Sequence, residues 1–504
     1  MDKPRHKLFR LVGTFSDEEL AGAEKHLSAL NREAACLKLF KKMKKLPTET
    51  LAGPDAKGIL FRSVFPGQAY NDARLRKLMA HLTQHLEDYL IQSELEKDEA
   101  FRQHLLIRSL QRRSDYKLFK EAVGQRLKTL EGQPLRSTAY FQERHQLLKD
   151  LYYHPETAKR SMGEDVFGQY LLAGERHILL ASLLDAGEQL VREKTTVSRA
   201  RFPMLDAALS IAARQEDGQP AAQALFSQVL TLLRSPGEDA DLPGLKAGLQ
   251  NVFPELGETE QRMALKLLIH YALPFSNNGS QAHSRFMFDL YQLGIHSGLL
   301  QQGDNAIETN LFVNISTVGI LVGELDWVAR FMEQYGPLLP AEDRESAYHI
   351  CWANWHYHVG LSGGGRSSLD EAIKHLLRVP TRSEDKFDLR ARSLLLRVHF
   401  DAFQMDVREE SLDDVLAQAK NFEQYLRRHA TYPTPKKESY LRFIGHCRQL
   451  ARLVNQPGTT SAEYRLFLEA LLSDSHCALR RWLEEKAGAL LHAPTEKPLT
   501  FNTQ

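Results

Sequence analysis

The helical periodicity between residues 305 and 430 limits the possible folds more than any other feature of the sequence. Three pairs of predicted helices follow one another in this stretch. In the first pair, apolar residues recur at helical spacing as far as Val322, a turn at Gly323 follows, and the period resumes at Trp327. One such pair cannot bury both of its apolar faces, so each pair has to stack on the next. The stretch predicts an all-α protein, an α-solenoid of stacked antiparallel helix hairpins with a degenerate tetratricopeptide-like repeat.

The rest of the chain keeps the helical period. Ser16 and Glu19 have the spacing of a capping box, and Asn71 is a candidate cap for a helix that continues to about Glu96. Residues 165–193 favour another long helix. No segment alternates apolar and polar residues over a strand's length with β-branched enrichment, so we expect essentially no sheet.

Further boundaries follow from breaks and caps. Residues 99–158 are expected to hold two or three helices, and residues 461–490 one closing helix. Ser368 and Glu371 have the spacing of a second capping box. The helix predicted over residues 344–361 is apolar nearly all round, which places it inside a stack. The aromatic residues Trp327, Trp352 and Trp355 are therefore expected to belong to the core.

Four regions are expected along the 504 residues. They are a basic helical N-terminal region (1–98), irregular helical hairpins (99–300), tetratricopeptide-like helix pairs (301–490) and a flexible tail (491–504). Length alone would favour several domains, but a stack of repeats can reach this size without a globular boundary.

Composition and cysteine use indicate an ordinary folded protein of a reducing compartment. Apolar residues make up 43% and charged residues 26%, which excludes a disordered or collagen-like chain. The four cysteines are far apart and form no C-x-x-C pair, so neither structural zinc nor redox chemistry is expected. Because neither a secretory signal nor an uninterrupted apolar span is found, we expect a cytoplasmic protein that does not enter the membrane.

Charge is distributed unevenly. Residues 1–160 contain 30 Lys and Arg against 21 Asp and Glu, a net charge of +9, which leaves −8 for residues 161–504. An anionic partner at the N-terminal end would explain this asymmetry. Packing of one half on the other, or head-to-tail association of copies, would explain it equally well.

A basic cluster in the N-terminal region is the candidate patch for an anionic partner, nucleic acid included. It consists of Lys38, Lys41, Lys42, Lys44, Lys45, Arg74, Arg76 and Lys77, with Arg112 and Arg113 downstream. The linker over residues 66–72 is longer than the turn of a helix-turn-helix. Acidic neighbours such as Glu87 and Asp88 dilute the charge. Solvated lysines on the outer face of a helix are the preferred interpretation.

A glycine-rich segment offers a candidate phosphate loop. It consists of Gly363, Gly364, Gly365, Arg366 and Ser367, and a predicted helix follows it. It lacks the G-K-[ST] ending of a P-loop, and no strand precedes it. A flexible linker with a serine cap at Ser368 explains the same residues.

Four potential metal ligands, His349, Cys351, His356 and His358, crowd one predicted helix. Helical geometry separates them: His349 and His356 share a face but lie about 10.5 Å apart along the axis, whereas Cys351 and His358 point away. Glu345 and His349 alone could share an ion. Structural histidines in an aromatic layer are therefore favoured, and we expect no metal and no cofactor.

The segments 70–90 and 277–300, together with Gly323–Val328 and Phe331, resemble a family of wholly helical, tetratricopeptide-like proteins common in Bacteroidota. The resemblance covers most of the chain and implies an α-solenoid. It implies no activity and no site residues. Successive pairs begin about 36 and 44 residues apart, against 34 in the standard repeat, and the W-L-G-Y pattern is not satisfied.

The sequence contains no G-x-S-x-G, H-E-x-x-H or other recognisable catalytic signature. We therefore expect a scaffold or adaptor, not an enzyme, that holds a protein or peptide partner on a concave surface. The alternative is a regulator whose basic N-terminal third binds nucleic acid while the repeats sense a partner. Partner identity and oligomeric state do not follow from the residues.

Overall fold

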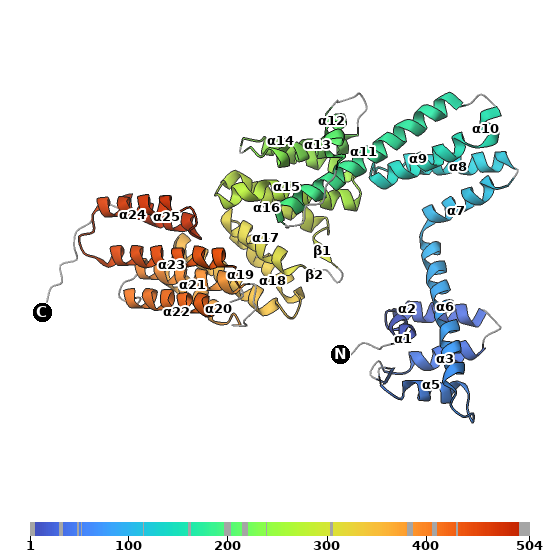
Figure 1. The fold of residues 1–504 in the computed structure, drawn as a ribbon, viewed down its shortest axis with the longest axis horizontal. Coiled ribbons are helices and arrows are strands. Elements are labelled where there is room, and N and C mark those ends of the chain that lie inside the picture. The colour runs from blue at the N-terminus through green and yellow to red at the C-terminus, as the bar shows by residue number, and fades with distance from the viewer. Residues whose placement is uncertain are drawn as a thin grey trace. The chain divides into compact units, whose positions relative to one another are not determined.

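A computed structural model of the chain describes residues 6–29, 34–47, 50–51, 53–113, 115–159, 163–195, 203–213, 220–237, 239–302, 306–380, 387–405, 411–429 and 432–492 (Figure 1). Nearly all of these residues that lie outside turns are helical, which confirms the all-α prediction. The only sheet among them is a two-residue antiparallel pair, β1 (Gln301–Gln302) with β2 (Ala306–Ile307). This pair is a small correction to the expectation of no strand: it closes the connection that leads into the next helix. Most of the predicted tail, 491–504, lies outside the described residues.

The chain divides into two compact units, residues 1–133 with 146–170 and residues 134–145 with 171–504. The first unit holds α1 (Lys7–Val12), α2 (Asp17–Ala29), α3 (Ala34–Lys44), α5 (Ala56–Val64), α6 (Asp72–Lys97), α7 (Glu99–Gln111), α8 (Tyr116–Glu131) and α10 (Pro155–Lys159). Two helices, α9 (Thr138–Tyr152) and α11 (Gly163–Thr195), contribute to both units. The divisions predicted after residues 98 and 300 stay a prediction.

The second unit continues with α12 (Leu205–Ala212), α13 (Ala221–Arg234), α14 (Leu242–Val252), η1 (Phe253–Glu255), α15 (Glu258–Asn277), α16 (Gln281–His296), α17 (Thr309–Leu321), α18 (Leu325–Tyr335) and η3 (Gly336–Leu338). It ends with α19 (Arg344–Val359), η4 (Gly360–Gly364), α20 (Gly365–Leu377), α21 (Asp388–Met405), α22 (Leu412–Arg428), α23 (Thr434–Asn455), α24 (Ser461–Ser473) and α25 (Arg480–His492).

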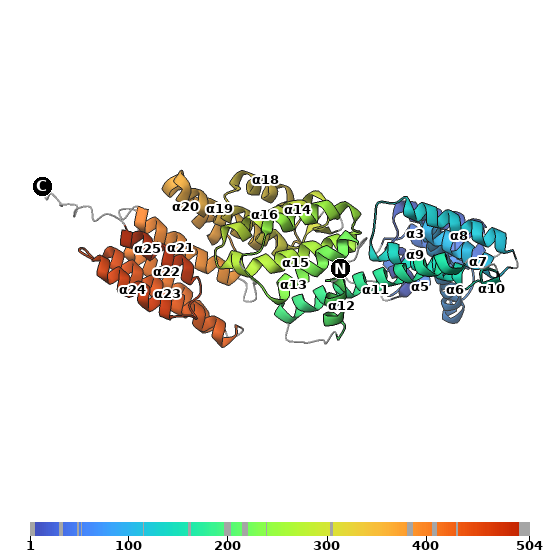
Figure 2. The same cartoon turned by 90° about the horizontal axis from the view of Figure 1, so that it is seen from above.

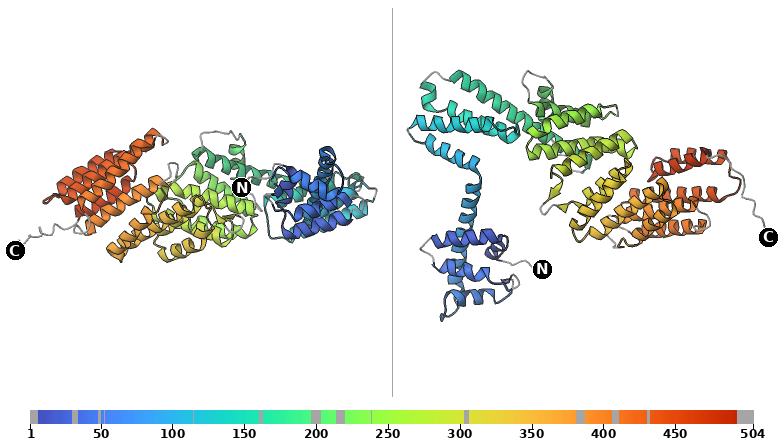
Figure 3. Two further views of the ribbon diagram at one scale, coloured as in Figure 1. Left: turned by 90° about the horizontal axis from the view of Figure 1, so that it is seen from below. Right: turned by 180° about the vertical axis from the view of Figure 1, so that it is seen from behind.

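The long helix α6 organises the start of the first unit. It packs against α1, α2, α3 and α5, and the view from behind in Figure 3 also shows these helices around it. The predicted cap is present, because the Asn71 side chain accepts a hydrogen bond from the Arg74 amide at 2.9 Å. The Ser16 and Glu19 capping box is also confirmed, with its two bonds at 2.8 and 3.2 Å. The shared core of these helices includes the fully buried Phe40, Leu60 and Leu82.

In the second unit, each helix from α15 to α25 packs on the next one along the chain. Figures 1 and 2 both show α21, α22 and α23 side by side. The predicted turn between α17 and α18 is confirmed at Gly323, whose φ of +80° suits a residue without a Cβ. Helix α19 contacts α17, α18, α20 and α21, as its apolar surface predicts. Its Trp355 Nε1 donates to the Leu325 carbonyl at 2.9 Å, and the ring is half-buried.

Three predicted boundaries were wrong. Residues 99–158 hold four helices, α7 to α10, because short polar turns interrupt the helical period more often than expected. The single closing helix is instead α24 and α25, separated by a turn in which Leu479 has a φ of +50°. Helix α20 begins at Gly365, and Ser368 donates to the Gly364 carbonyl at 3.4 Å instead of capping a helix. Gly363 in η4 and Gly365 at the start of α20 both have positive φ values, and no described side chain caps α20.

Candidate functional site

The outer face of α7 carries exposed apolar side chains. Ile107 is the buried residue of this helix, while Phe101 is 51% and Leu105 42% exposed. Leu106 is also exposed, but it lies about 100° from Leu105 around the helix axis and so on another face. Single exposed apolar side chains are ordinary, and the pair Phe101 and Leu105 becomes a candidate surface only together with its charged neighbours.

Arginines continue this face toward the end of α7. Leu105, Arg108, Ser109, Arg112 and Arg113 line a cavity of about 610 Å³. Arg113 donates from Nη1 to the Ser109 carbonyl at 2.7 Å, which holds this side chain along the helix. Within the described part of the chain, Arg108 and Arg112 form no ion pair with a carboxylate.

Three acidic residues next to α7 in the sequence are occupied by caps or by another cation. Asp98 caps the helix by accepting from the Phe101 amide at 2.9 Å, and Glu99 pairs with Arg102 at 3.2 Å. Asp115 caps α8 by accepting from the Leu118 amide at 3.1 Å. Caps and pairs of this kind fix the carboxylates on the backbone or on another cation. The positive charge of Arg108 and Arg112 is therefore left facing solvent.

The basic cluster predicted from the sequence is divided between α3 and α6. Lys38 and Lys45 are exposed and Lys42 is half-buried. Lys41 and Lys44 each lie 3.4 Å from a carboxylate oxygen of Glu24, so α2 offsets part of their charge.

On α6, Arg76 pairs with Asp72 at 2.8 Å. Arg74 donates to Gln68 at 2.6 Å and stacks over the Phe65 ring at 4.0 Å, whereas Lys77 is exposed. Half of the predicted patch is thus engaged within the fold, and surface pairs of this kind hold a cation only weakly. Lys38, Lys45 and Lys77 remain the most accessible members.

The glycine-rich segment forms the reversal between α19 and α20. Gly363 and Gly364 are exposed, as is Ser367. The Arg366 Nε donates to Asp370 Oδ1 at 2.9 Å, within its own helix, and the side chain is mostly buried. The segment therefore supplies a tight turn, and its one cation already has a carboxylate partner.

His349 and His356 share a face of α19, as helical geometry predicts. Both rings contact His375 of α20, a residue that the sequence reasoning missed. His349 Nδ1 lies 2.9 Å from His375 Nδ1, and the rings of His356 and His375 stack at 5.5 Å. Cys351 is buried away from them, and the neighbours of His358 are Arg397 and Lys486.

Burial keeps this histidine cluster uncharged at neutral pH. Desolvation lowers the pKa of His349 and of His356. The pKa of His375 falls to about 4, because burial and its two histidine neighbours all disfavour a proton. Two neutral rings share a single N–H between their Nδ1 atoms, an arrangement that joins α19 to α20.

A buried polar network joins α19, α21 and α25. The Tyr357 hydroxyl donates to Asp401 Oδ2 at 2.6 Å and accepts from Trp482 Nε1 at 2.9 Å. Lys486 Nζ lies 2.7 Å from Asp401 Oδ1, and Asp401 is only 1% exposed. Burial raises the pKa of Asp401, and the Lys486 charge opposes that rise. A carboxylate enclosed in this way stabilises an interface between helices and does not reach a substrate.

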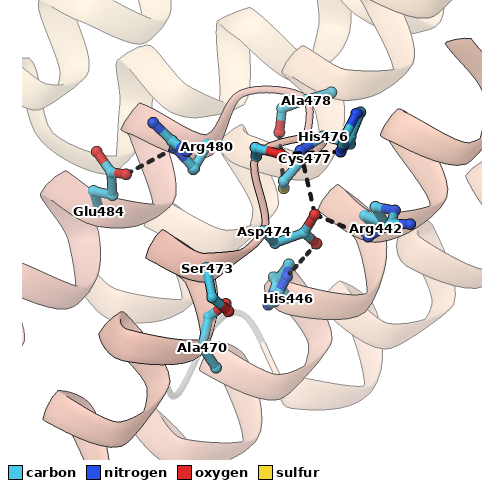
Figure 4. Close-up of polar contacts among 11 residues, drawn as sticks. Arg442, His446, Ala470, Ser473, Asp474, His476, Cys477, Ala478, Arg480 and Glu484 are labelled. Atoms are coloured by element: carbon cyan, nitrogen blue, oxygen red, sulfur yellow. Dashed lines mark hydrogen bonds and ion pairs between the residues drawn. The ribbon is translucent and has the colours of Figure 1, made fainter. Parts of the chain in front are cut away.

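Asp474 forms a second polar centre, in the turn between α24 and α25 (Figure 4). It accepts hydrogen bonds from Arg442 Nη1 at 2.9 Å and from His446 Nε2 at 3.1 Å, both on α23. Burial raises the pKa of Asp474, but the bonds from His446 and Arg442 outweigh it and the net shift is downward. Asp474 therefore ties the turn to α23.

An aspartate, a histidine and a cysteine in one place raise the possibility of nucleophilic catalysis. Burial raises the pKa of the nearby Cys477 thiol to about 12, so it carries no thiolate at neutral pH. Its Sγ donates to the Ala478 carbonyl at 3.3 Å. This arrangement fits a structural thiol and not a nucleophile.

Among the described residues, no group of three or more His, Cys, Asp or Glu is placed to hold a metal ion. No helix in the described ranges combines the length and the apolar character needed to cross a bilayer.

Comparisons with protein-family models, with curated proteins and with solved structures find no match. The resemblance to the tetratricopeptide-like family therefore stays a prediction. The site that the structure adds is the face of α7, of which the sequence reasoning had named only Arg112 and Arg113. The spacing F-x3-L-x2-R-x3-R, from Phe101 to Arg112, was the available signal.

Proposed function

We propose that this chain is a cytoplasmic α-solenoid scaffold, without enzymatic activity of its own, that binds a protein or peptide partner. The observation that carries the proposal is the outer face of α7, where exposed Phe101 and Leu105 adjoin Arg108 and Arg112, which are exposed and form no ion pair among the described residues. A mixed apolar and charged surface of this kind is typical of protein recognition.

The helix contacts of the second unit support the solenoid part of the proposal. Successive packing from α15 to α25, with α17 also contacting α19 and α23 also contacting α25, is the pattern of stacked hairpins. The bond from Trp482 to Tyr357, 125 residues apart, is an addition that nearest-neighbour stacking does not require. It seals the last helices against α19, as a capping repeat does.

The buried titratable groups support a role without chemistry. Asp401, Asp474 and the histidine cluster each have partners inside the fold, as described above. The four cysteines are free and buried, which supports a reducing compartment.

Peptide selection on the full-length protein tests the proposal. A random 16-residue library displayed on phage is panned on the immobilised chain, and enriched peptides are resynthesised for fluorescence anisotropy. We expect groups of peptides with related sequences that bind with micromolar or better affinity. Free peptide of the same sequence should displace them. Absence of any competable family would overturn the scaffold proposal.

A nucleic-acid-binding regulator is the second candidate, because Lys38, Lys45 and Lys77 are exposed in the basic first unit. Anisotropy with a 20-nucleotide single strand and the matching duplex, at about 50 and 200 mM salt, tests it. Under this candidate, binding is salt-sensitive and is lost on changing Lys41, Lys42, Lys44 and Lys45 to Glu. Salt-independent or absent binding at micromolar protein would remove the candidate.

A further inference from the structure

We infer that the outer face of α7 is the docking site for an acidic amphipathic helix of a partner protein. This inference rests on the proposed scaffold function and goes beyond it, because it names both the surface and the chemistry of the partner.

The geometry of α7 defines a single stripe. At 100° per residue, Phe101, Leu105, Arg108 and Arg112 lie within about 60° of one another around the helix axis. Over these residues the stripe is about 17 Å long, which corresponds to three turns of a facing helix. Its first half is apolar and its second half is cationic. This order sets a direction as well as a position for the partner.

Charge complementarity selects an acidic partner. Asp98, Glu99 and Asp115 are bound as caps or to Arg102, and no carboxylate among the described residues forms an ion pair with Arg108 or Arg112. The cavity of about 610 Å³ beside Arg108 and Arg112 leaves room for carboxylate side chains. Planar guanidinium groups bind carboxylates through two parallel hydrogen bonds, which gives such contacts direction.

The apolar half of the stripe favours protein over nucleic acid. Burying apolar area contributes about 25 cal/mol per Å². A base can stack on Phe101, but Leu105 has no aromatic face and gains this energy mainly against another apolar side chain. A sugar-phosphate backbone would leave Leu105 against charged oxygens. Nucleic acid also needs cations spaced along an extended track, whereas Arg108 and Arg112 occupy one helical turn.

The expected partner segment follows from this stripe. It carries two apolar residues four positions apart at one end and acidic residues seven, eight and eleven positions from the first of them. The acidic end lies over Arg108 and Arg112. Amphipathic helices that dock on a helical surface present their anchors at this i, i+4, i+7 spacing.

Two stapled helical peptides test the inference on the full-length protein by fluorescence anisotropy. One carries Leu and Phe at positions i and i+4 with Glu at i+7, i+8 and i+11, and the other has Lys at those three positions. The variants are Arg108→Glu/Arg112→Glu and, as a control with the same change in net charge, Lys38→Glu/Lys45→Glu, which lie on α3 and directly after it. Circular dichroism of each variant confirms that it is folded.

We expect the acidic peptide to bind the wild type at least tenfold more tightly than the lysine peptide. The arginine variant should bind the acidic peptide at least tenfold more weakly than the wild type does. It should bind the lysine peptide more tightly, and misfolding cannot produce such a gain in affinity. The lysine control should stay within about twofold of the wild type, since its charges lie outside the stripe. The inference would be overturned if both peptides bound the wild type equally. It would also be overturned if the acidic peptide bound the arginine variant as tightly as the wild type.

Two further outcomes separate this inference from the functions proposed above. If phage-selected peptides bind the wild type and the arginine variant alike, the scaffold function stands and the α7 site falls. If a 20-nucleotide strand binds the wild type, fails on the arginine variant, and the acidic peptide does not bind, the stripe is a nucleic-acid surface and the inference is wrong.

Discussion

The α7 face and the network around Asp401 use polar groups in opposite ways. Arg108 and Arg112 are exposed and have no carboxylate partner in the described ranges, whereas Asp401 is enclosed and bound by Lys486 and Tyr357. Surface charge contributes little to folding but is free for a ligand. A ligand cannot reach an enclosed charge, and breaking the contacts of such a charge lowers the free energy of unfolding. Arg108 and Arg112 are therefore exposed charges that a ligand can reach, whereas Asp401 is a charge that holds helices together.

The strongest way to break this comparison is Asp401→Ala. The change leaves the Lys486 ammonium and the Tyr357 hydroxyl without their buried acceptor, so we expect a loss of about 3 to 5 kcal/mol in the free energy of unfolding. Urea denaturation followed by circular dichroism measures it.

A double variant distinguishes the lost charge pair from lost packing. Asp401→Leu/Lys486→Met replaces both ions with apolar groups of similar size and should recover most of that stability. The surface change Asp206→Ala, which removes a partner of Arg234, should stay within about 0.5 kcal/mol of the wild type. A cost for Asp401→Ala no larger than that of Asp206→Ala would contradict the structural role of the network.

Acid should weaken the second unit through the histidine cluster. The unfolded chain binds a proton at His375 near pH 6.5, whereas the folded chain does so only at about 4. Stability therefore falls as pH drops through this window and levels off below it. Because solvent screens a half-buried ring, we expect His375 to account for about 1 kcal/mol of the loss in the free energy of unfolding. The measurement is the urea midpoint at pH 7 and at pH 4.5.

His375→Gln is the matched control for that pH dependence. Glutamine keeps a hydrogen-bonding group near His349 but does not titrate, so the difference between the two midpoints should shrink. An unchanged difference would assign the acid sensitivity to other groups, such as His358, whose pKa is also lowered to about 4 by burial, Arg397 and Lys486.

Asp474→Asn should have a smaller effect. The substitution removes the charge that Arg442 and His446 bind, and we expect a loss of about 1 kcal/mol. Because the pKa of Asp474 is lowered in the fold, this contribution is present at neutral pH and disappears as pH falls through that pKa. The free energies of unfolding of the wild type and of Asp474→Asn should therefore become equal in strong acid. A difference that persists there would show that the charge of Asp474 is not the cause.

The smallest effect is expected from Arg108→Glu/Arg112→Glu. If these side chains serve recognition alone, the free energy of unfolding should stay within about 0.5 kcal/mol of the wild type. A larger loss, measured in the same urea assay, would give the arginines a structural role and erase the contrast with Asp401.

Local patterns in the sequence were enough to predict much of the fold. The caps at Ser16 and Asn71, the turn at Gly323 and the interior position of α19 all depend on residues a few positions apart. The break between α24 and α25 escaped prediction because Asp474–Leu479 contains no proline or glycine. Its geometry depends on contacts with α23, such as the bond from the Ala478 amide to the Ser439 carbonyl.

The functional surfaces were harder to predict for two different reasons. Asp401, Tyr357 and Trp482 come from three helices, and no periodicity connects residues 125 positions apart. His375 escaped for the same reason, since it joins His349 only through the reversal between α19 and α20. The stripe on α7 was present in the spacing of Phe101 and Arg112, but which helix face is open depends on the packing of its neighbours.

The link from Tyr357 to Trp482 also orders the events of protein synthesis. Domains form as the chain emerges from the ribosome, N-terminal parts first. The helices α19 and α21 leave the ribosome well before α25, so the Asp401 carboxylate has to stay hydrated until Lys486 and Trp482 have been made. Water can therefore leave the surroundings of Asp401 only late in translation. The packing of these helices is completed by residues that the ribosome adds long after the aspartate.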